Sequence, residues 1–350
     1  MHMADALVTP IVGSAMLVAA AGVTAYSVKK IKKEEDIQNK IPLMGVVSAF
    51  VFAAQMVNFS IPGTGSSGHI GGGILLSAIL GPYAGFISLA SILIVQALFF
   101  GDGGLIALGC NIINLGFFSC FIGYKLIYKK MIGEKYSKKK IMIASILASV
   151  VGLQIGSLFV AIQTLSSGVT ELPFSTFLIF MQPIHLAIGI VEGIVTGLVL
   201  NFIYENRPDI LEKADIRKAY KMTKKKVISI ILVVALVVAG GISLLASSHP
   251  DGLEWSILKT SGSEELSYSG DVHEKVAEVQ NKTSFLLDYG FKSENLSKAQ
   301  ETTGNVIAGI VGVIITIGAI IPIAYLSTRR RKLYAVNGDI NEIEGNYKDN

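Results

Sequence analysis

Long apolar blocks dominate this sequence, and they limit the folds that it can adopt. Eight of them span roughly 11–28, 41–58, 70–100, 105–128, 141–164, 183–205, 227–246 and 305–327. The whole chain is 51% hydrophobic and 16% charged, whereas a soluble domain carries about 25% charged residues. Because about 20 apolar residues are needed to cross the hydrocarbon core of a bilayer, we predict an all-α polytopic membrane protein.

The polar segments between these blocks differ strongly in charge. Lys and Arg gather in four of them, with five in 29–40, six in 129–140, eight in 206–226 and five in 329–350. Short loops rich in Lys and Arg stay on the cytoplasmic side of a membrane. This distribution accounts for the net charge of +4, so we expect membrane lipid around the chain and no nucleic acid as a partner.

The two basic segments 29–40 and 129–140 must lie on the same side, so an even number of crossings separates them. The block 70–100 therefore has to cross twice, and Gly81-Pro82 is the natural break within it. We expect a short helix at about 70–80 and a full helix at about 83–100. The count then becomes nine helices, with the N-terminus outside and the C-terminus in the cytoplasm.

This topology divides the chain into four parts. Residues 1–205 form a seven-helix bundle, and 206–226 form a basic cytoplasmic linker. Residues 227–327 hold two further transmembrane helices flanking a polar extracytoplasmic segment, 247–304, and 328–350 form a cytoplasmic tail. No G-x-x-x-x-G-K-[ST] phosphate-binding motif occurs, so we expect a chain that does not hydrolyse ATP itself.

A segment rich in Gly and Ser, "NFSIPGTGSSGHIGGG" (58–73), follows the second apolar block and contains His69. Its Gly63–Gly68 stretch matches G-x-G-x-x-G, a pattern that binds dinucleotides only between a strand and a helix. An apolar membrane helix precedes it here, which argues against that use. Glycines leave little bulk around His69, so another segment can approach the ring closely.

The chain begins "MHMADALVTP", with no basic segment ahead of it of the kind that opens a signal peptide. The amine of Met1, the amide nitrogen of His2 and a ring nitrogen of His2 can close adjacent chelate rings around one ion. His69 would supply a fourth nitrogen, since the charge pattern of the loops places it on the same side. Square-planar nitrogen sites suit Ni²⁺ or Cu²⁺. The alternative is that His2 is a solvated end residue and His69 an ordinary polar loop residue.

His185 and Glu192 lie seven residues apart in the block 183–205, and so on one face of a helix. Ionisable residues inside a membrane helix mark functional sites by default. They are candidates to orient a metal-binding histidine, or they hydrogen-bond one helix to another. Asn58, Asn111 and Asn114 are similar candidates.

The remaining histidines and the cysteines are weaker candidates for a functional site. We expect His249 and His273 to be surface residues rather than ligands. The two cysteines, Cys110 and Cys120, fit no C-x-x-C pattern and no disulfide framework, so we interpret both as small core residues.

Several long motifs occur together in this chain. "MHMADALVTP", "NFSIPGTGSSGHIGGGILL", "GDGGLIALGCNIINLG" (101–116) and "PIHLAIGIVEGIVTGLVLNF" (183–202) resemble the CbiM/NikM family. Its members are substrate-binding components of energy-coupling factor transporters for cobalt and nickel. The resemblance covers about 1–205, and "SSHPDGLEWS" (247–256) resembles the PDGLE segment of the small NikN-like subunit, fused here to the same chain.

The resemblance implies a seven-helix substrate-binding bundle in a prokaryotic cell membrane. It implies a metal site made of Met1, His2 and His69, with the N-terminus tucked into the bundle. Asp5 aligns with an acidic residue of the family, although the neighbouring Pro and Gly do not. The implied partners are a transmembrane coupling subunit and two ATPase subunits, and the ion is a transported substrate rather than a permanent cofactor.

Two other functions compete with this one. A self-contained divalent-cation channel or secondary carrier would place acidic residues along a pore, and only Glu192 qualifies among the helices of 1–205. A membrane enzyme would need a general base and an open coordination position beside the metal. The proposed nitrogens would fill that position, so we do not expect an enzyme.

Overall fold

The computed structural model describes the chain except for residues 35–36, 134–135, 213, 215–219, 264–265, 267–269, 293–296 and 347–350. Parts of the predicted linker 206–226, segment 247–304 and tail 328–350 therefore lie outside the described residues. The α-helices are α1 (Pro10–Ile31), α2 (Ile37–Gln55), α3 (Gly73–Leu80), α4 (Pro82–Val95), α5 (Leu108–Asn111), α6 (Lys129–Ile132), α7 (Lys138–Ser166), α8 (Phe174–Asn206), α9 (Lys224–Gly240), α10 (Gly252–Ser261), α11 (Asp271–Thr283) and α12 (Lys298–Asn346). The π-helical stretches Gln96–Phe100 and Ile112–Tyr128 continue α4 and α5.

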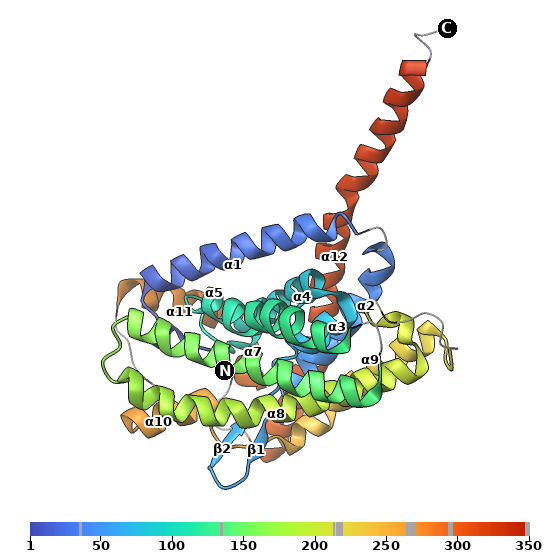
Figure 1. Ribbon diagram of the computed structural model, residues 1–350. Helices are drawn as coiled ribbons and strands as arrows, with labels where there is room; N and C mark the ends of the chain where they lie inside the picture. Colours follow the sequence, from blue (N-terminus) through green and yellow to red (C-terminus); the bar gives the residue numbers. More distant parts are fainter. Residues whose placement is uncertain are drawn as a thin grey trace.

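Two long helices, α7 and α8, lie side by side along one face of the molecule (Figure 1). They approach closely because α8 presents glycines at the contact. A Cβ on Gly189 would lie 2.8 Å from Val150 Cα, and one on Gly193 would lie 2.3 Å from Ile146 Cα. Small residues at such contacts are typical of helix packing in membranes.

The predicted break at Gly81-Pro82 is confirmed. Helix α3 ends at Leu80, α4 begins at Pro82, and Gly81 between them has φ 88°. All eight residues of α3 are buried. A helix of this length rises only about 12 Å, so α3 is an internal element that packs under longer helices.

Six helices in the described part of the chain are long and apolar enough to cross a membrane: Pro10–Ile31, Pro82–Phe100, Leu108–Ile132, Lys138–Ser166, Phe174–Asn206 and Ala299–Tyr325. A shorter apolar helix spans Lys40–Gln55. The prediction of an all-α membrane protein is therefore confirmed in its general form. The arrangement of seven helices plus two stays a prediction.

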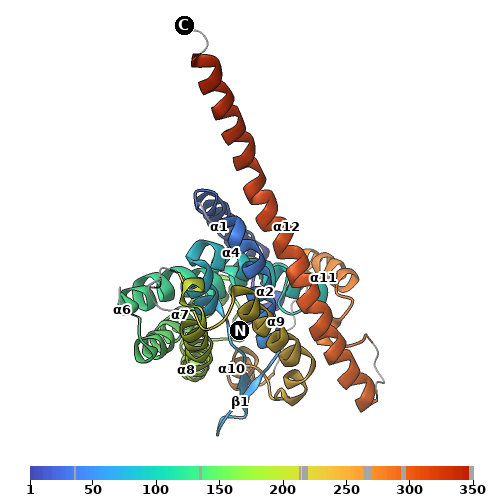
Figure 2. The ribbon, with the colours of Figure 1, turned by 90° about the vertical axis from the view of Figure 1, so that its right-hand side faces the viewer.

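The Gly-rich segment forms a small hairpin that the sequence did not predict. Strands β1 (Phe59–Ile61) and β2 (Ser66–Gly68) pair antiparallel, with Ser60 opposite Ser67. The N-terminus lies in the middle of the helices in both views, while the C-terminal part of α12 extends far from them (Figures 1 and 2). The first residues of the chain therefore meet the core of the bundle.

Candidate metal site

The first residues of the chain run into the bundle and are held there by their main chain. The Met3 N–H donates to Asn111 Oδ1 at 2.7 Å, and Asn111 Nδ2 donates back to the Met3 carbonyl at 3.2 Å. The Gly104 N–H donates to the same carbonyl at 2.9 Å. Met1 and Met3 are 4% and 0% exposed. The side-chain amide of Asn111 thus acts as a neighbouring strand would, and it fixes the path of residues 1–3.

The amine of Met1 lies 3.0 Å from His69 Nε2, across 68 residues of sequence. On the other side of the ring, Nδ1 lies 3.1 Å from the Ile70 carbonyl and donates to it. This hydrogen bond fixes the tautomer and leaves the lone pair of Nε2 facing the amine. A metal-binding histidine is oriented in the same way.

Glu192 holds the loop that carries His69. Its carboxylate accepts hydrogen bonds from the Gly71 N–H at 2.7 Å and the Gly72 N–H at 3.1 Å. Gln55 Nε2 donates to the Gly71 carbonyl at 2.8 Å. Gly72 has φ 79°, a conformation that favours glycine. Glu192 was predicted to orient a histidine, and it contacts the main chain two and three residues after His69.

The His2 ring stacks on the His69 ring, with centroids 5.0 Å apart and planes 7° apart. His2 Nδ1 lies 3.1 Å from Asp102 Oδ1. Tyr289 donates its hydroxyl to Asp102 Oδ2 at 2.6 Å. His2 Nε2 is buried and has no hydrogen-bond partner among the described residues. The structure therefore brings Met1, His2 and His69 together, with one His2 nitrogen held by a carboxylate.

A second carboxylate reaches the site from the far part of the sequence. Asp251 Oδ2 accepts a hydrogen bond from the Met1 amine at 2.8 Å and lies 3.9 Å from His69 Nε2. The side chains of Met1 and Asp251 are 3% and 14% exposed. The amine is thus enclosed between a histidine of the Gly-rich loop and an aspartate 250 residues away.

Burial and charge set the protonation of these groups. Burial, reinforced by the nearby amine, lowers the pKa of His69 to about 3. Burial would raise the pKa of Asp251 and of Asp102, but the amine beside Asp251 and the ring of His2 beside Asp102 hold each well below its usual value. At neutral pH the site therefore holds a neutral His69 and two carboxylates.

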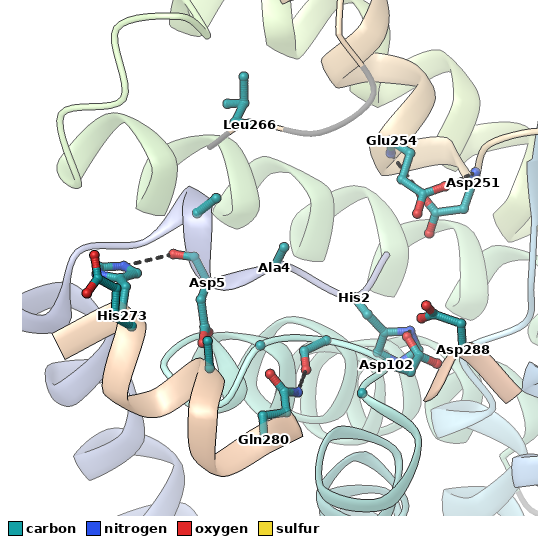
Figure 3. Close-up of a pocket in the computed structure, with 16 residues that line it drawn as sticks. His2, Ala4, Asp5, Asp102, Asp251, Glu254, Leu266, His273, Gln280 and Asp288 are labelled. Atoms are coloured by element: carbon teal, nitrogen blue, oxygen red, sulfur yellow. Dashed lines mark hydrogen bonds and ion pairs between the residues drawn. The ribbon is translucent and has the colours of Figure 1, made fainter. Parts of the chain in front are cut away.

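A cavity of about 480 Å³ lies beside His2 (Figure 3). It is lined by His2, Ala4, Asp5, Ala6, Gly101, Asp102, Gly103, Gly104, Asp251, Glu254, Leu266, His273, Glu274, Ala277, Gln280 and Asp288. Six of these residues are acidic and none is Lys or Arg. The surroundings of the N-terminus therefore favour cations.

The other predicted residues lie as follows. His185 Nδ1 bonds to the Met181 carbonyl of its own helix at 2.8 Å, and its Nε2 is buried without a partner among the described residues. Asn58 offers its carbonyl to the Ser247 N–H at 2.7 Å. Asp5 Oδ1 accepts from the Ala107 N–H at 3.0 Å. These hydrogen bonds join His185, Asn58 and Asp5 to main-chain groups rather than to Met1, His2 or His69.

Asn114, His249 and His273 are the remaining polar residues for which the sequence made a prediction. Asn114 pairs with Gln163, donating at 2.7 Å. His249 is exposed, as expected. His273 was expected at the surface, which is wrong, since it is 7% exposed and its Nε2 lies 3.1 Å from the Val8 carbonyl. Helix α11 packs over the N-terminal segment, and this cannot be foreseen from local sequence.

Main-chain groups are essential to what this arrangement can bind. Among the described residues, no group of three His, Cys, Asp or Glu side chains is placed to hold a metal ion. The amine and His69 Nε2, however, have a separation of 3.0 Å. Adjacent nitrogens at about 2.0 Å from one ion in a square plane lie about 2.8 Å apart. The spacing suits a late divalent ion bound through the N-terminus.

Sequence reasoning missed Asp251, Asp102 and Tyr289. Asp251 had a local signal, because "PDGLE" places an Asp three residues before a Glu, which predicts a helix N-cap. Nothing local indicated that the free oxygen of that cap would meet the amine of Met1. Asp102 and Tyr289 have no such signal.

Comparison with known proteins gave two family matches. The family described as "Cobalt uptake substrate-specific transmembrane region", CbiM, matches residues 2–210. The PDGLE domain matches residues 225–329. Together the two matches account for most of the chain.

Individual relatives match over much of their length. A putative fused nickel transport protein NikMN of Archaeoglobus fulgidus is 30% identical over 91% of this chain and 96% of its own. A probable fused nickel transport protein LarMN of Lactiplantibacillus plantarum is 30% identical over 73% of this chain and 78% of its own. A crystal structure of a truncated transition metal transporter is 33% identical, with a TM-score of 0.52, and the match covers 59% of this chain and 99% of that one.

Proposed function

Because the chain belongs to the CbiM family of cobalt-uptake transmembrane proteins and carries a PDGLE domain, we propose that it captures Ni²⁺ or Co²⁺ for import. In this proposal it is the substrate-binding component of an energy-coupling factor transporter. A separate transmembrane coupling subunit and two ATPase subunits supply the energy. The ion is cargo, and the chain needs no permanent cofactor.

The contact between the Met1 amine and His69 Nε2 supports this function most directly. We propose that the ion takes the place between these two nitrogens. The amide nitrogen and a ring nitrogen of His2 complete its coordination. His2 Nδ1, which is the ring nitrogen nearest the backbone, exchanges the carboxylate of Asp102 for the ion.

The contacts that hold the donor segments in the bundle explain how such a site selects among metal ions. Main-chain contacts at Met3 and at Gly71–Gly72 fix the two segments that carry the donors. Rigid donors bind ions that accept the imposed spacing, because deformation costs energy. Neutral His69 needs no loss of a proton on binding, as its pKa is about 3.

The proposal also has a topological part. We propose that residues 1–205 form the binding bundle, that 206–226 link it in the cytoplasm, and that 227–327 form the fused module. The N-terminus and the segment 247–304 then face the outside, and the tail 328–350 faces the cytoplasm. The contacts of Asp251 and His69 with the same amine agree with this arrangement.

Adding one glycine before Met1 tests the site. The amine becomes an amide nitrogen at that position and loses its basic lone pair, so we expect no measurable binding of Ni²⁺ in isothermal titration of the full chain. His69→Ala should have nearly the same effect. His249→Ala, which removes an exposed histidine, should bind as the unchanged chain does. Native affinity in the extended chain would remove the amine from the site.

A further inference from the structure

The amine of Met1 has a partner that the metal site alone does not require. Asp251 Oδ2 accepts its hydrogen bond at 2.8 Å, and the pair is almost enclosed, with side chains 3% and 14% exposed. Asp251 belongs to the region matched by the PDGLE domain, and Met1 to the start of the binding bundle. The fused module thus contacts a proposed metal ligand directly.

The Asp251 side chain cannot turn away from the amine easily, because it is also the N-cap of α10. Oδ1 accepts from the Leu253 N–H at 2.7 Å and the Glu254 N–H at 2.9 Å. The Glu254 side chain accepts from the Asp251 N–H at 2.9 Å, which completes a capping box. With Oδ1 fixed by the helix, Oδ2 is held toward the amine.

Helix α10 is itself docked on the hairpin that precedes His69. The Ser67 N–H donates to the Pro250 carbonyl at 2.8 Å, and Ser67 Oγ donates to the His249 carbonyl at 2.8 Å. Trp255 Nε1 donates to the Thr64 carbonyl at 3.0 Å. The position of the carboxylate is therefore tied to the loop that supplies the second proposed nitrogen.

A close approach to α8 completes the docking. A Cβ on Gly252 would lie 2.6 Å from Ile184 Cγ2 and 3.3 Å from His185 Cε1. Leu253 next to it is 2% exposed. Every residue of "PDGLE" thus contributes to the docking, since Pro250 and Gly252 seat the helix, Leu253 is buried, and Asp251 and Glu254 form the cap.

We propose that Asp251 is a positioning residue for the metal site, and that orienting the Met1 amine is a function of the fused module. The carboxylate accepts one N–H of the amine and so directs the rest of that nitrogen toward His69 Nε2. This inference rests on the proposed function. Partners of this kind typically change metal affinity by about 10–100-fold.

Asp251→Asn is the sharpest test. Asparagine caps helices as well as aspartate does, so its oxygen keeps α10 in place. Its NH₂ group then faces the amine, and two donors cannot bond. We expect Ni²⁺ affinity of the purified full chain to fall about tenfold or more in isothermal titration, and the ligand-field absorption of bound Ni²⁺ to shift.

The matched control is Glu278→Gln, which removes an exposed carboxylate of α11 that does not line the cavity. It should bind Ni²⁺ as the unchanged chain does. Trp255 is the only tryptophan, so its emission reports whether α10 stays docked. The emission maximum of the metal-free protein should be the same in both variants and in the unchanged chain.

The results of these measurements distinguish the role of Asp251 from the proposed function of the chain. Affinity within twofold of the unchanged chain, or tighter binding, in Asp251→Asn overturns the inference, and tighter binding shows a carboxylate that competes with the ion. A loss accompanied by a shift of Trp255 emission also overturns it, because the role is then structural. An unchanged chain that binds neither Ni²⁺ nor Co²⁺ contradicts the proposed function instead.

Discussion

The bundle and the fused module hold the same site in different ways. The bundle fixes main chain, through Asn111 on Met3 and Glu192 on Gly71 and Gly72. The module acts through side chains, with Asp251 on the amine and Tyr289 on Asp102, the carboxylate that holds His2. One region therefore sets where the donors are, and the other sets how they point. Substitutions in the bundle should therefore lower Ni²⁺ affinity more than substitutions in the fused module.

Among the variants that compare the two regions, the largest effect should come from Glu192→Leu. It leaves two buried N–H groups without a partner, and each costs about 1–3 kcal/mol. Because the loop before α3 then shifts with His69, we expect Ni²⁺ affinity to fall about 100-fold in isothermal titration. Glu192→Gln keeps one acceptor oxygen and should lose less. Equal affinities in Glu192→Leu and the unchanged chain would mean that the bundle does not place His69.

A pH titration of stability probes the buried ring. The pKa of His69 is about 3 in the folded protein and 6.5 as the ordinary value. As pH falls below 6.5, the unfolded chain takes up a proton and the folded chain does not, so stability is lost. Between pH 6.5 and 5 the loss is about 2 kcal/mol.

Thermal unfolding of the metal-free protein in detergent, followed at pH 7 and pH 5, measures that loss. His69→Asn cannot titrate there, and its unfolding temperature should depend less on pH by the corresponding amount. The same pH dependence in both proteins would contradict a neutral, enclosed His69.

The smallest effect should come from the module side. In Gly252→Ala, the new methyl meets methyl groups of two isoleucine side chains, Ile184 Cγ2 at 2.6 Å and Ile188 Cδ1 at 3.0 Å. These can move, so α10 should shift slightly. A slight shift of α10 should cost a fraction of a kcal/mol in binding free energy, so we expect Ni²⁺ binding to be about threefold weaker. We also expect a red shift of Trp255 emission.

Gly22→Ala is the matched control, since a Cβ there has nothing within 4 Å. It should leave both the affinity and the emission unchanged. A loss in Gly252→Ala that exceeds the loss in Glu192→Leu would reverse the comparison, and would make the module the main support of the site.

Several features of this protein followed from the sequence alone. Apolar blocks predicted membrane helices, because bilayer thickness fixes their length. Gly81-Pro82 predicted the break between α3 and α4, because glycine and proline together mark a turn rather than a helix interior. The motifs around Met1, His2 and His69 predicted the family that the comparisons then showed.

Other features depended on long-range packing. That His69 Nε2 faces the amine depends on contacts across 68 residues, and Asp251 joins them across 250. The burial of His273 depends in the same way on α11 covering the N-terminal segment. Local sequence patterns determine which hydrogen-bonding and metal-binding groups a segment carries, because these groups depend only on the residues of that segment. Only the tertiary structure decided which of those groups meet, because that depends on how the helices pack.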